Sequence, residues 1–137
     1  MPQTAVADAV MESFVIEGGQ PLTGSLRAAG NKNGALPILA ACVLTSEPVV
    51  LSNVPRIIDV ETMLELLADI GVDVDWVGEN QIRVHAANVS KVELDEALCG
   101  QMRASVLLAG PLLARCGKAV VPPPGGDDSS KSASKRK

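Results

Sequence analysis

The feature that most constrains the fold is an apolar stripe at helical spacing between Val60 and Ile70. Apolar side chains recur there every three or four residues, which is the period of one helix face. Asp59 stands before the stripe as a good N-cap, and Gly71 after it ends a helix. The chain then alternates apolar and acidic residues over 72–76, which predicts a half-buried strand. A helix that runs directly into a strand makes a mixed α/β fold the expectation.

Helical and extended patterns alternate along the first 85 residues. Asn33 is the expected N-cap of an earlier apolar helix, and Pro37 falls in its first turn, where a missing N–H costs nothing. In order, we expect extended segments at 14–17 and 22–29, a tight turn at 30–34, a helix at 35–44, a strand at 49–51, a helix at 59–70, and strands at 72–76 and 81–85. The order is strand, helix, strand, helix, strand, strand.

The same kind of pattern restarts near residue 92 and then breaks off. We expect helical turns at 92–98, an apolar helix at 101–115 that is kinked or broken at Gly110–Pro111, a strand at 118–121 and a loop at 122–127. Beyond Asp127 almost no apolar residue remains, so no packed structure can form. The predicted organisation is a disordered extension at 1–12, an incomplete fold at 13–127 and a disordered basic tail at 128–137.

Charge and aromatic content exclude nucleic acid as a partner of the body. The formal charge is −4 although the tail is basic, so the body is more acidic than the whole chain. An acidic body repels a phosphate backbone. Phe14 and Trp76 are the one Phe and the one Trp, and there is no Tyr, so no stacking platform exists for single strands. Nucleic acid could be bound only through the cations Lys131, Lys135, Arg136 and Lys137.

The cysteine and histidine content predicts neither a metal site nor a cofactor. Three widely spaced cysteines and a single His do not provide standard zinc spacing or a disulfide framework. Cys42 and Cys116 lie in apolar runs and are expected to be reduced core residues of a cytoplasmic protein. His85 is expected to be structural. The longest uncharged run, between Lys32 and Glu47, is too short to span a bilayer, so no membrane partner is expected.

Two cations have the surroundings of a binding site. Lys32 precedes a helix N-terminus in a glycine-containing turn, where an ammonium, free N–H groups and the helix dipole could converge on an anion. The alternative is a solvated turn lysine. Arg103 lies in an apolar segment, so it either meets a carboxylate or faces a ligand cleft, and the residues alone leave both open. Arg115 and Lys118 are interpreted as surface charges near a helix end.

Several motifs occur together in the order of one known family. They read LTGS and GNKNGALPILAA within 22–41, NVPR at 53–56, DV at 59–60, MRAS at 102–105, GPL at 110–112 and PGGD at 124–127. This set resembles the first part of the UDP-N-acetylglucosamine enolpyruvyl transferases, or 1-carboxyvinyltransferases. The sister family acting on shikimate 3-phosphate usually has Ser after the corresponding Lys, where this chain has Asn33. The resemblance covers roughly 11–127 and only the beginning of a longer family chain.

The resemblance implies a fold and a reaction. The family fold consists of two inside-out α/β barrels built from strand–helix–strand–helix–strand–strand units, and this chain would hold about one and a half units. In the family the first strands belong with the other domain. The implied reaction transfers the enolpyruvyl group of phosphoenolpyruvate to the 3′-hydroxyl of UDP-N-acetylglucosamine and releases phosphate. It is the first committed step of peptidoglycan synthesis.

The resemblance also implies roles for four residues. Lys32 and Asn33 would contact phosphoenolpyruvate, and Arg103 would contact the UDP-N-acetylglucosamine region. Asp127 stands where the family usually has a loop Cys and would protonate the methylene carbon. An ordinary aspartate has a pKa of about 3.9, so this role requires an upward shift in a drier site. The general-base carboxylate belongs to the part of the family chain that has no counterpart here.

Three functional readings follow. The first is an N-terminal portion of an enolpyruvyl transferase that is inactive alone, with phosphoenolpyruvate and UDP-N-acetylglucosamine as small-molecule ligands. The second is a non-catalytic remnant that binds the nucleotide sugar without turnover. The third is a protein that contacts nucleic acid through its basic tail. An incomplete barrel leaves apolar faces uncovered, so we also expect self-association.

Overall fold

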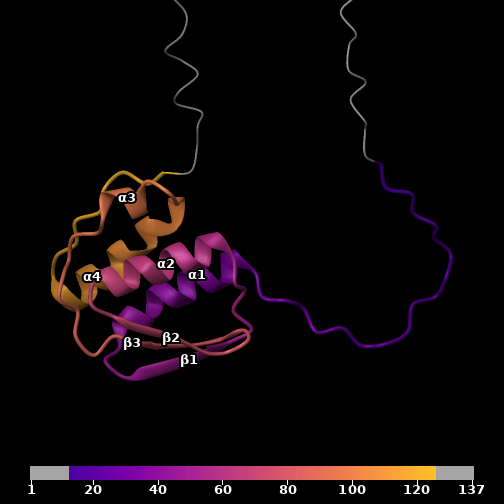
Figure 1. Ribbon diagram of the computed structural model, residues 1–137, viewed down its shortest axis with the longest axis horizontal. Coiled ribbons are helices and arrows are strands. Elements are labelled where there is room, and N and C mark those ends of the chain that lie inside the picture. The colour runs from indigo at the N-terminus through magenta and orange to yellow at the C-terminus, as the bar shows by residue number, and fades with distance from the viewer. Residues whose placement is uncertain (1–12, 126–137) are drawn as a thin grey trace, which may run out of the picture.

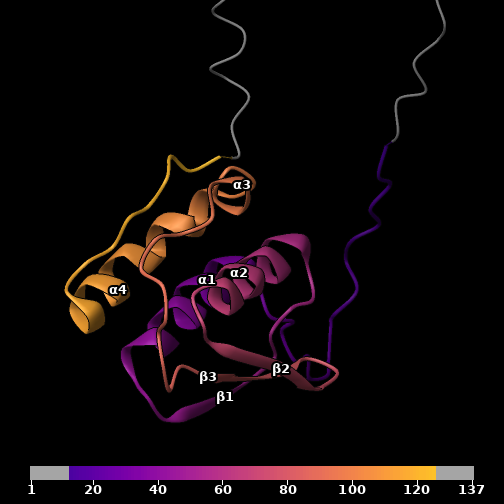
Figure 2. The ribbon, with the colours of Figure 1, turned by 60° about the vertical axis from the view of Figure 1, so that its left-hand side comes forward.

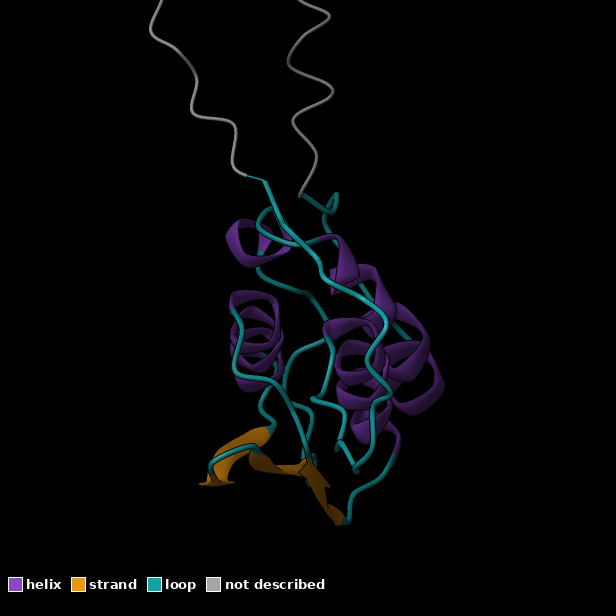
Figure 3. Cartoon of the chain, turned by 90° about the vertical axis from the view of Figure 1, so that its right-hand side faces the viewer, coloured by secondary structure: helices purple, strands orange, loops and turns teal. Residues whose placement is uncertain are grey.

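Three antiparallel strands in the order β1–β3–β2 form one layer of the molecule (Figures 1 and 3). The computed structural model describes residues 13–125. The strands run Pro48–Ser52 (β1), Asp73–Gly78 (β2) and Gln81–His85 (β3). Central strand β3 directs the fully buried Ile82 and Val84 to one face, the alternation that a half-buried strand requires. The strands predicted at 49–51, 72–76 and 81–85 are confirmed, with small shifts at their ends.

Two helices cover one face of this sheet. They are α1 (Lys32–Ala41), which continues as a 3₁₀ turn η1 (Cys42–Leu44), and α2 (Ile58–Asp69). Figure 2 shows both helices on the same side of the strands. The helices predicted at 35–44 and 59–70 are therefore confirmed, and the order from helix α1 to strand β3 is the predicted one.

Both helices begin earlier than predicted, and both predicted N-caps are wrong. Asn31, not Asn33, caps α1, since its Oδ1 accepts a hydrogen bond from the Gly34 N–H at 2.9 Å. In α2 the cap position is Ile57, which makes no side-chain cap bond, and Asp59 lies inside the first turn. Asn31 and Asn33 stand on either side of Lys32, so residue type alone could not show which asparagine caps α1. The carboxylate of Asp59 is thereby available to a partner outside its own helix.

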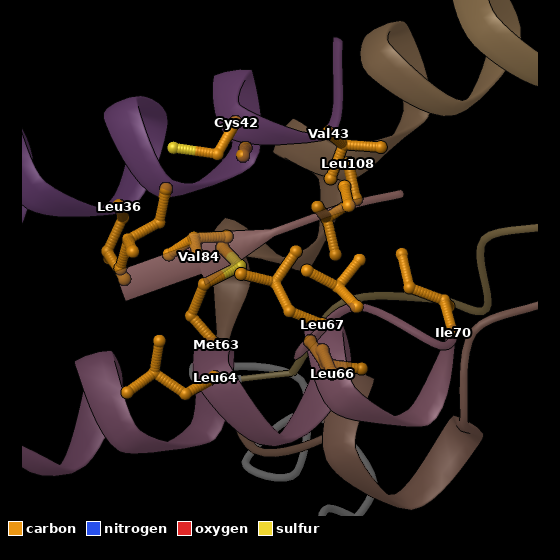
Figure 4. Close-up of a cluster of buried hydrophobic side chains, with 14 of the residues drawn as sticks. Leu36, Cys42, Val43, Met63, Leu64, Leu66, Leu67, Ile70, Val84 and Leu108 are labelled. Carbon is orange, nitrogen blue, oxygen red and sulfur yellow. The ribbon is translucent and has the colours of Figure 1, made fainter. Parts of the chain in front are cut away.

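The core lies between the helices and the sheet and is aliphatic. Leu36 of α1, Met63 and Leu67 of α2 and Val84 of β3 point toward one another in Figure 4. Cys42 is buried, as predicted. The largest fully buried side chains are Leu39, Met63, Leu66, Leu67, Ile70, Ile82, Leu94, Leu108 and Leu112. The apolar stripe on α2 therefore faces the core, as its spacing predicted.

The C-terminal part packs beside α1 and α2 as three short helical pieces. They are α3 (Glu96–Cys99), the 3₁₀ helix η2 (Arg103–Leu108) and α4 (Ala109–Cys116). The apolar helix predicted at 101–115 is thus divided, although the break lies at the junction of η2 and α4 rather than at Gly110–Pro111. Pro111 falls in the first turn of α4, where its missing N–H is tolerated.

The ends of this second unit are less regular than predicted. The helical turns expected at 92–98 are confined to the short helix α3. The strand expected at 118–121 is reduced to an isolated parallel bridge between Glu93 and Val120. Across residues 13–125 no helix has both the length and the apolar character needed to cross a bilayer.

The strands predicted at 14–17 and 22–29 are wrong. No residue in either range is assigned to a strand, and Phe14, Leu22 and Leu26 are 96%, 96% and 95% exposed. Figure 1 shows this indigo segment running away from the helices and the sheet. A strand requires a neighbouring strand to satisfy its backbone groups, and no strand within residues 13–125 pairs with this segment.

Two predictions near the end of α4 are also wrong. Arg115 is not a surface charge: its Nη1 donates to the carbonyls of Val43 and Thr45 at 2.9 and 2.8 Å, and its Nη2 donates to the Ala87 carbonyl at 3.0 Å. The guanidinium therefore ties three separate segments together, which requires partners that sequence spacing does not reveal. Cys116 is exposed instead of buried, because it lies on the outer side of the last turn of α4.

Candidate functional site

A hollow of about 450 Å³ lies where the first turns of α1 and α2 approach the start of η2. It contains three of the four predicted site residues, Lys32, Asn33 and Arg103. Its lining consists of Lys32, Asn33, Leu36, Asp59, Gln101, Met102, Arg103 and Ala104. The fourth predicted residue, Asp127, lies outside the described residues, as do the predicted extension at 1–12 and tail at 128–137.

The turn before α1 places Lys32 and Asn33 at the hollow. The Gly30 N–H donates to Asn53 Oδ1 at 3.1 Å, and Asn53 Nδ2 donates to the Ala28 carbonyl at 3.1 Å. A Cβ on Gly30 would overlap the Asn53 carbonyl, so only glycine permits this approach. Asn53 itself has a positive φ of 60°, a conformation that asparagine tolerates better than most residues. The hydrogen bonds between this turn and Asn53 were not predicted.

The ammonium of Lys32 is held by a carboxylate from the other helix. Lys32 Nζ lies 2.7 Å from Asp59 Oδ2, and the two side chains are 53% and 35% exposed. Asp59 also lines the hollow, so the ion pair forms part of its wall. This role of Asp59 was not predicted, because a carboxylate before an apolar stripe is equally well explained as a helix cap. No local signal links the two residues, which are 27 positions apart.

Arg103 is the first residue of η2 and lines the same hollow. The flanking residues explain its position: Met102 and Ser105 are buried, and Ser105 Oγ donates to the Met102 carbonyl at 3.2 Å. The buried neighbours fix the turn, and Arg103 as a whole residue is exposed. Arg103 lines a cleft, which is one of the two environments left open by the sequence.

The glycine-rich loop returns to the neighbourhood of the hollow. The Gly125 N–H donates to the Cys99 carbonyl at 2.8 Å, and a Cβ on Gly125 would overlap the Gly100 carbonyl. Gly100 directly precedes Gln101, which lines the hollow.

Burial raises the pKa of the Cys99 thiol, and a hydrogen bond with Ser105 partly offsets this rise. Cys99 therefore stays a protonated thiol at neutral pH.

A second hollow of about 440 Å³ adjoins the first through the same ion pair. Its lining is Lys32, Arg56, Ile57, Ile58 and Asp59. The Arg56 guanidinium lies 4.2 Å from the centre of the Trp76 ring, a cation–π contact that holds the arginine beside β2. Lys32 and Asp59 thus line both hollows, whereas Arg103 lines the first and Arg56 the second.

Comparison with known proteins agrees on one family. The family model of EPSP synthase (3-phosphoshikimate 1-carboxyvinyltransferase) matches residues 16–131. A UDP-N-acetylglucosamine 1-carboxyvinyltransferase of Bradyrhizobium diazoefficiens is 53% identical over 109 residues, which is 80% of this chain and 25% of that protein. Its counterpart in Treponema denticola is 45% identical over 112 residues, 82% of this chain and 26% of that protein. The chain thus spans about a quarter of the length of these curated relatives.

A solved structure shows the same fold. The enolpyruvyl transferase NikO from Streptomyces tendae matches with a TM-score of 0.63 and 29% identity, over 74% of this chain and 24% of that one. The predicted fold class, an α/β fold of the enolpyruvyl transferase type, is confirmed by this match, which spans about a quarter of the matched chain. Sequence and structure together show that the chain belongs to the EPSP synthase (3-phosphoshikimate 1-carboxyvinyltransferase) family.

Proposed function

We propose that the chain is the N-terminal portion of a cytoplasmic enzyme that transfers enolpyruvyl from phosphoenolpyruvate to the 3′-hydroxyl of UDP-N-acetylglucosamine and releases phosphate. This places the complete enzyme at the first committed step of peptidoglycan synthesis. The observation that carries the proposal is the single hollow lined by Lys32, Asn33 and Arg103. Its volume of about 450 Å³ falls within the usual range of small-molecule sites.

The start of α1 supplies the phosphoenolpyruvate subsite. The first N–H groups of a helix have no partner within the helix, and the dipole there attracts negative charge. Lys32 and Asn33 are the first two residues of α1, so an ammonium and an amide are added to that field. A phosphate could accept hydrogen bonds from all of these donors at once. We assign Lys32 and Asn33 to the phosphate of phosphoenolpyruvate.

Arg103 supplies the nucleotide-sugar subsite. Its planar guanidinium can bind a diphosphate through two parallel hydrogen bonds, which a lysine cannot do. Arg103 lines the same hollow as Lys32, so the two substrates would meet between the start of α1 and the start of η2. Binding both reactants in one hollow lowers the activation free energy of a two-substrate reaction, because the loss of translational and rotational entropy occurs on binding.

We assign the proton donor to Asp127, two residues beyond the last described residue, Gly125. Two residues of chain reach at most about 7 Å, and Gly125 is held at Gly100 next to the lining of the hollow. In the reaction, the sugar hydroxyl loses its proton to a base and adds to C2 of phosphoenolpyruvate while Asp127 protonates C3. The tetrahedral adduct then loses a proton from C3 to a base and expels phosphate from C2, which restores the C2=C3 double bond of the enolpyruvyl product. A carboxyl can act so near neutrality only where desolvation raises its pKa.

The chain alone is proposed to bind without turnover. A base must accept the proton of the sugar hydroxyl, and no described residue of this hollow is assigned that role. The chain also spans about a quarter of its relatives. The alternative is a non-catalytic remnant that binds the nucleotide sugar. It is favoured if Arg103 binds UDP-N-acetylglucosamine and Lys32 binds no phosphoenolpyruvate.

The test is a calorimetric and NMR titration of the 137-residue chain with each substrate, together with a phosphate-release assay. Lys32→Met should weaken phosphoenolpyruvate binding about tenfold or more, because it removes a charge-assisted contact. Lys91→Met is the matched control: Lys91 also lies 2.7 Å from an aspartate, Asp69, but away from the hollow. Equal losses in the two variants, or phosphoenolpyruvate binding that is indifferent to Lys32, would exclude this site.

Arg103→Ala should abolish UDP-N-acetylglucosamine binding and leave phosphoenolpyruvate binding nearly intact. Arg83→Ala is its control, since Arg83 pairs with Asp75 on the sheet at 3.1 Å and does not line the hollow. Phosphate release by the wild-type chain with both substrates present would show that turnover needs no further part of the family fold. Retained nucleotide-sugar affinity in Arg103→Ala would move that subsite elsewhere.

A further inference from the structure

The charge at the start of α1 is opposite to the one that a helix N-terminus favours. An N-terminal first turn is stabilised by acidic side chains and destabilised by cations. Helix α2 follows this rule with Asp59 and Glu61 in its first turn, whereas α1 has no acidic residue there and begins with Lys32. Departures from local rules that are compensated elsewhere concentrate at functional sites.

The compensating charge comes from Asp59, across the space between the two helices. Its Oδ2 lies 2.7 Å from Lys32 Nζ, and both residues line the two adjoining hollows. The carboxylate therefore stands where a ligand anion would meet the ammonium. Since the two side chains are 53% and 35% exposed, water screens the pair and it can open readily.

We propose that Asp59 is a resident counter-ion of Lys32, which a ligand phosphate must displace before it binds. This inference rests on the proposed function only for the identity of the ligand. The carboxylate reaches the ammonium through one oxygen. A phosphate dianion offers three oxygens to the ammonium and to the N–H groups at the start of α1, so it can replace the carboxylate.

The competing pair has two consequences for specificity. The pair keeps Lys32 from lying unpaired against the dipole of α1 when no ligand is bound. It also lowers the apparent affinity for every anion, because only molecules in which the pair is open can bind the anion. Exposed ion pairs of this kind bias an equilibrium by at most about fivefold. A monoanion that touches only the ammonium therefore gains little by opening the pair, whereas a phosphate that also bonds the helix N–H groups gains more.

The test compares Asp59→Asn with Asp69→Asn in the 137-residue chain. Both variants remove one negative charge and one 2.7 Å ion pair with a lysine, but only Asp59 lines the hollow. Asp59→Asn should bind inorganic phosphate and phosphoenolpyruvate about two- to fivefold more tightly. Asp69→Asn should leave both affinities unchanged, and circular dichroism establishes that each variant is folded.

A double variant and a side-chain signal separate displacement from a general field effect. In Lys32→Met the further change Asp59→Asn should produce no gain, because the carboxylate acts through the ammonium. In ¹⁵N spectra of the lysine ammonium groups, phosphate should shift the Lys32 signal toward its position in Asp59→Asn. A role confined to the stability of α2 would move neither readout.

The outcomes distinguish this inference from the proposed function. If phosphoenolpyruvate binds through Lys32 but Asp59→Asn binds no more tightly, the counter-ion role is overturned and the proposed function stands. If phosphoenolpyruvate does not bind, yet inorganic phosphate binds more tightly in Asp59→Asn than in wild type, the counter-ion role stands and the proposed substrate is wrong. If neither the wild-type chain nor Asp59→Asn binds an anion through Lys32, the counter-ion role and the proposed function are both overturned.

Discussion

The N-terminal segment 13–29 and the strand β3 share a prediction of extended structure and have opposite environments. The segment contains a short apolar run at 14–16, and β3 alternates apolar and polar residues. In β3, Ile82 and Val84 are fully buried between the helices and two neighbouring strands, whereas Phe14 and Ile16 are 96% and 88% exposed. The comparison shows that a strand pattern fixes which side chains share a face, but burial depends on a partner that the pattern does not name.

The largest expected effect comes from truncating the same residue type in the two regions. Leu67→Ala should lower the free energy of unfolding by about 2–5 kcal/mol, because Leu67 is fully buried and its removal leaves a cavity. Leu26→Ala should change it by less than about 0.5 kcal/mol, since Leu26 is 95% exposed. Urea denaturation followed by circular dichroism measures both. Similar losses in the two variants would mean that the N-terminal segment is packed in solution.

A smaller effect is expected where a single side chain joins segments distant in sequence. Arg115→Ala should cost about 2–3 kcal/mol, because it leaves the carbonyls of Val43, Thr45 and Ala87 without their charged donor. Lys118→Ala, three residues further along and exposed, is the control and should be nearly neutral. The same denaturation assay applies. A neutral Arg115→Ala would show that water replaces the guanidinium at no cost.

Local pattern was sufficient for the elements whose determinants lie within one element. The stripe on α2 and the alternation on β3 were predicted from spacing alone, and both face the core. The contacts of Arg115 could not be predicted, because its partners lie about 30 to 70 positions earlier in the chain and are backbone atoms of any residue type. Sequence spacing carries no information on such contacts.

The residues of the candidate site that lie in sequence motifs could be predicted. Lys32, Asn33 and Arg103 were named from the sequence and line one hollow. Asp59 was named as well, but its predicted role was a helix cap, which a carboxylate before an apolar stripe satisfies equally well. Only the packing of α2 against α1 shows that this carboxylate faces the lysine. Their pairing depends on tertiary packing, and the proposed counter-ion role of Asp59 rests on it.

The smallest effect on stability is expected from removing the N-terminal segment itself. A chain that starts at residue 27 keeps Ala28, whose carbonyl accepts a hydrogen bond from Asn53, and loses five large apolar side chains that are 88–96% exposed. Its free energy of unfolding should stay within about 0.5 kcal/mol of the full chain. Its tendency to self-associate, measured by sedimentation velocity, should fall, because exposed apolar surface drives association.

The control for this truncation keeps the chain length and changes only the surface. Replacing Phe14, Ile16 and Leu26 by Ser in the full chain should reduce self-association as the truncation does and leave unfolding unchanged, since these side chains contact solvent. A loss of stability on truncation without a loss on serine substitution would assign a role to the backbone of the segment. A loss in both would show that its apolar side chains are buried in solution, and the contrast with β3 would then disappear.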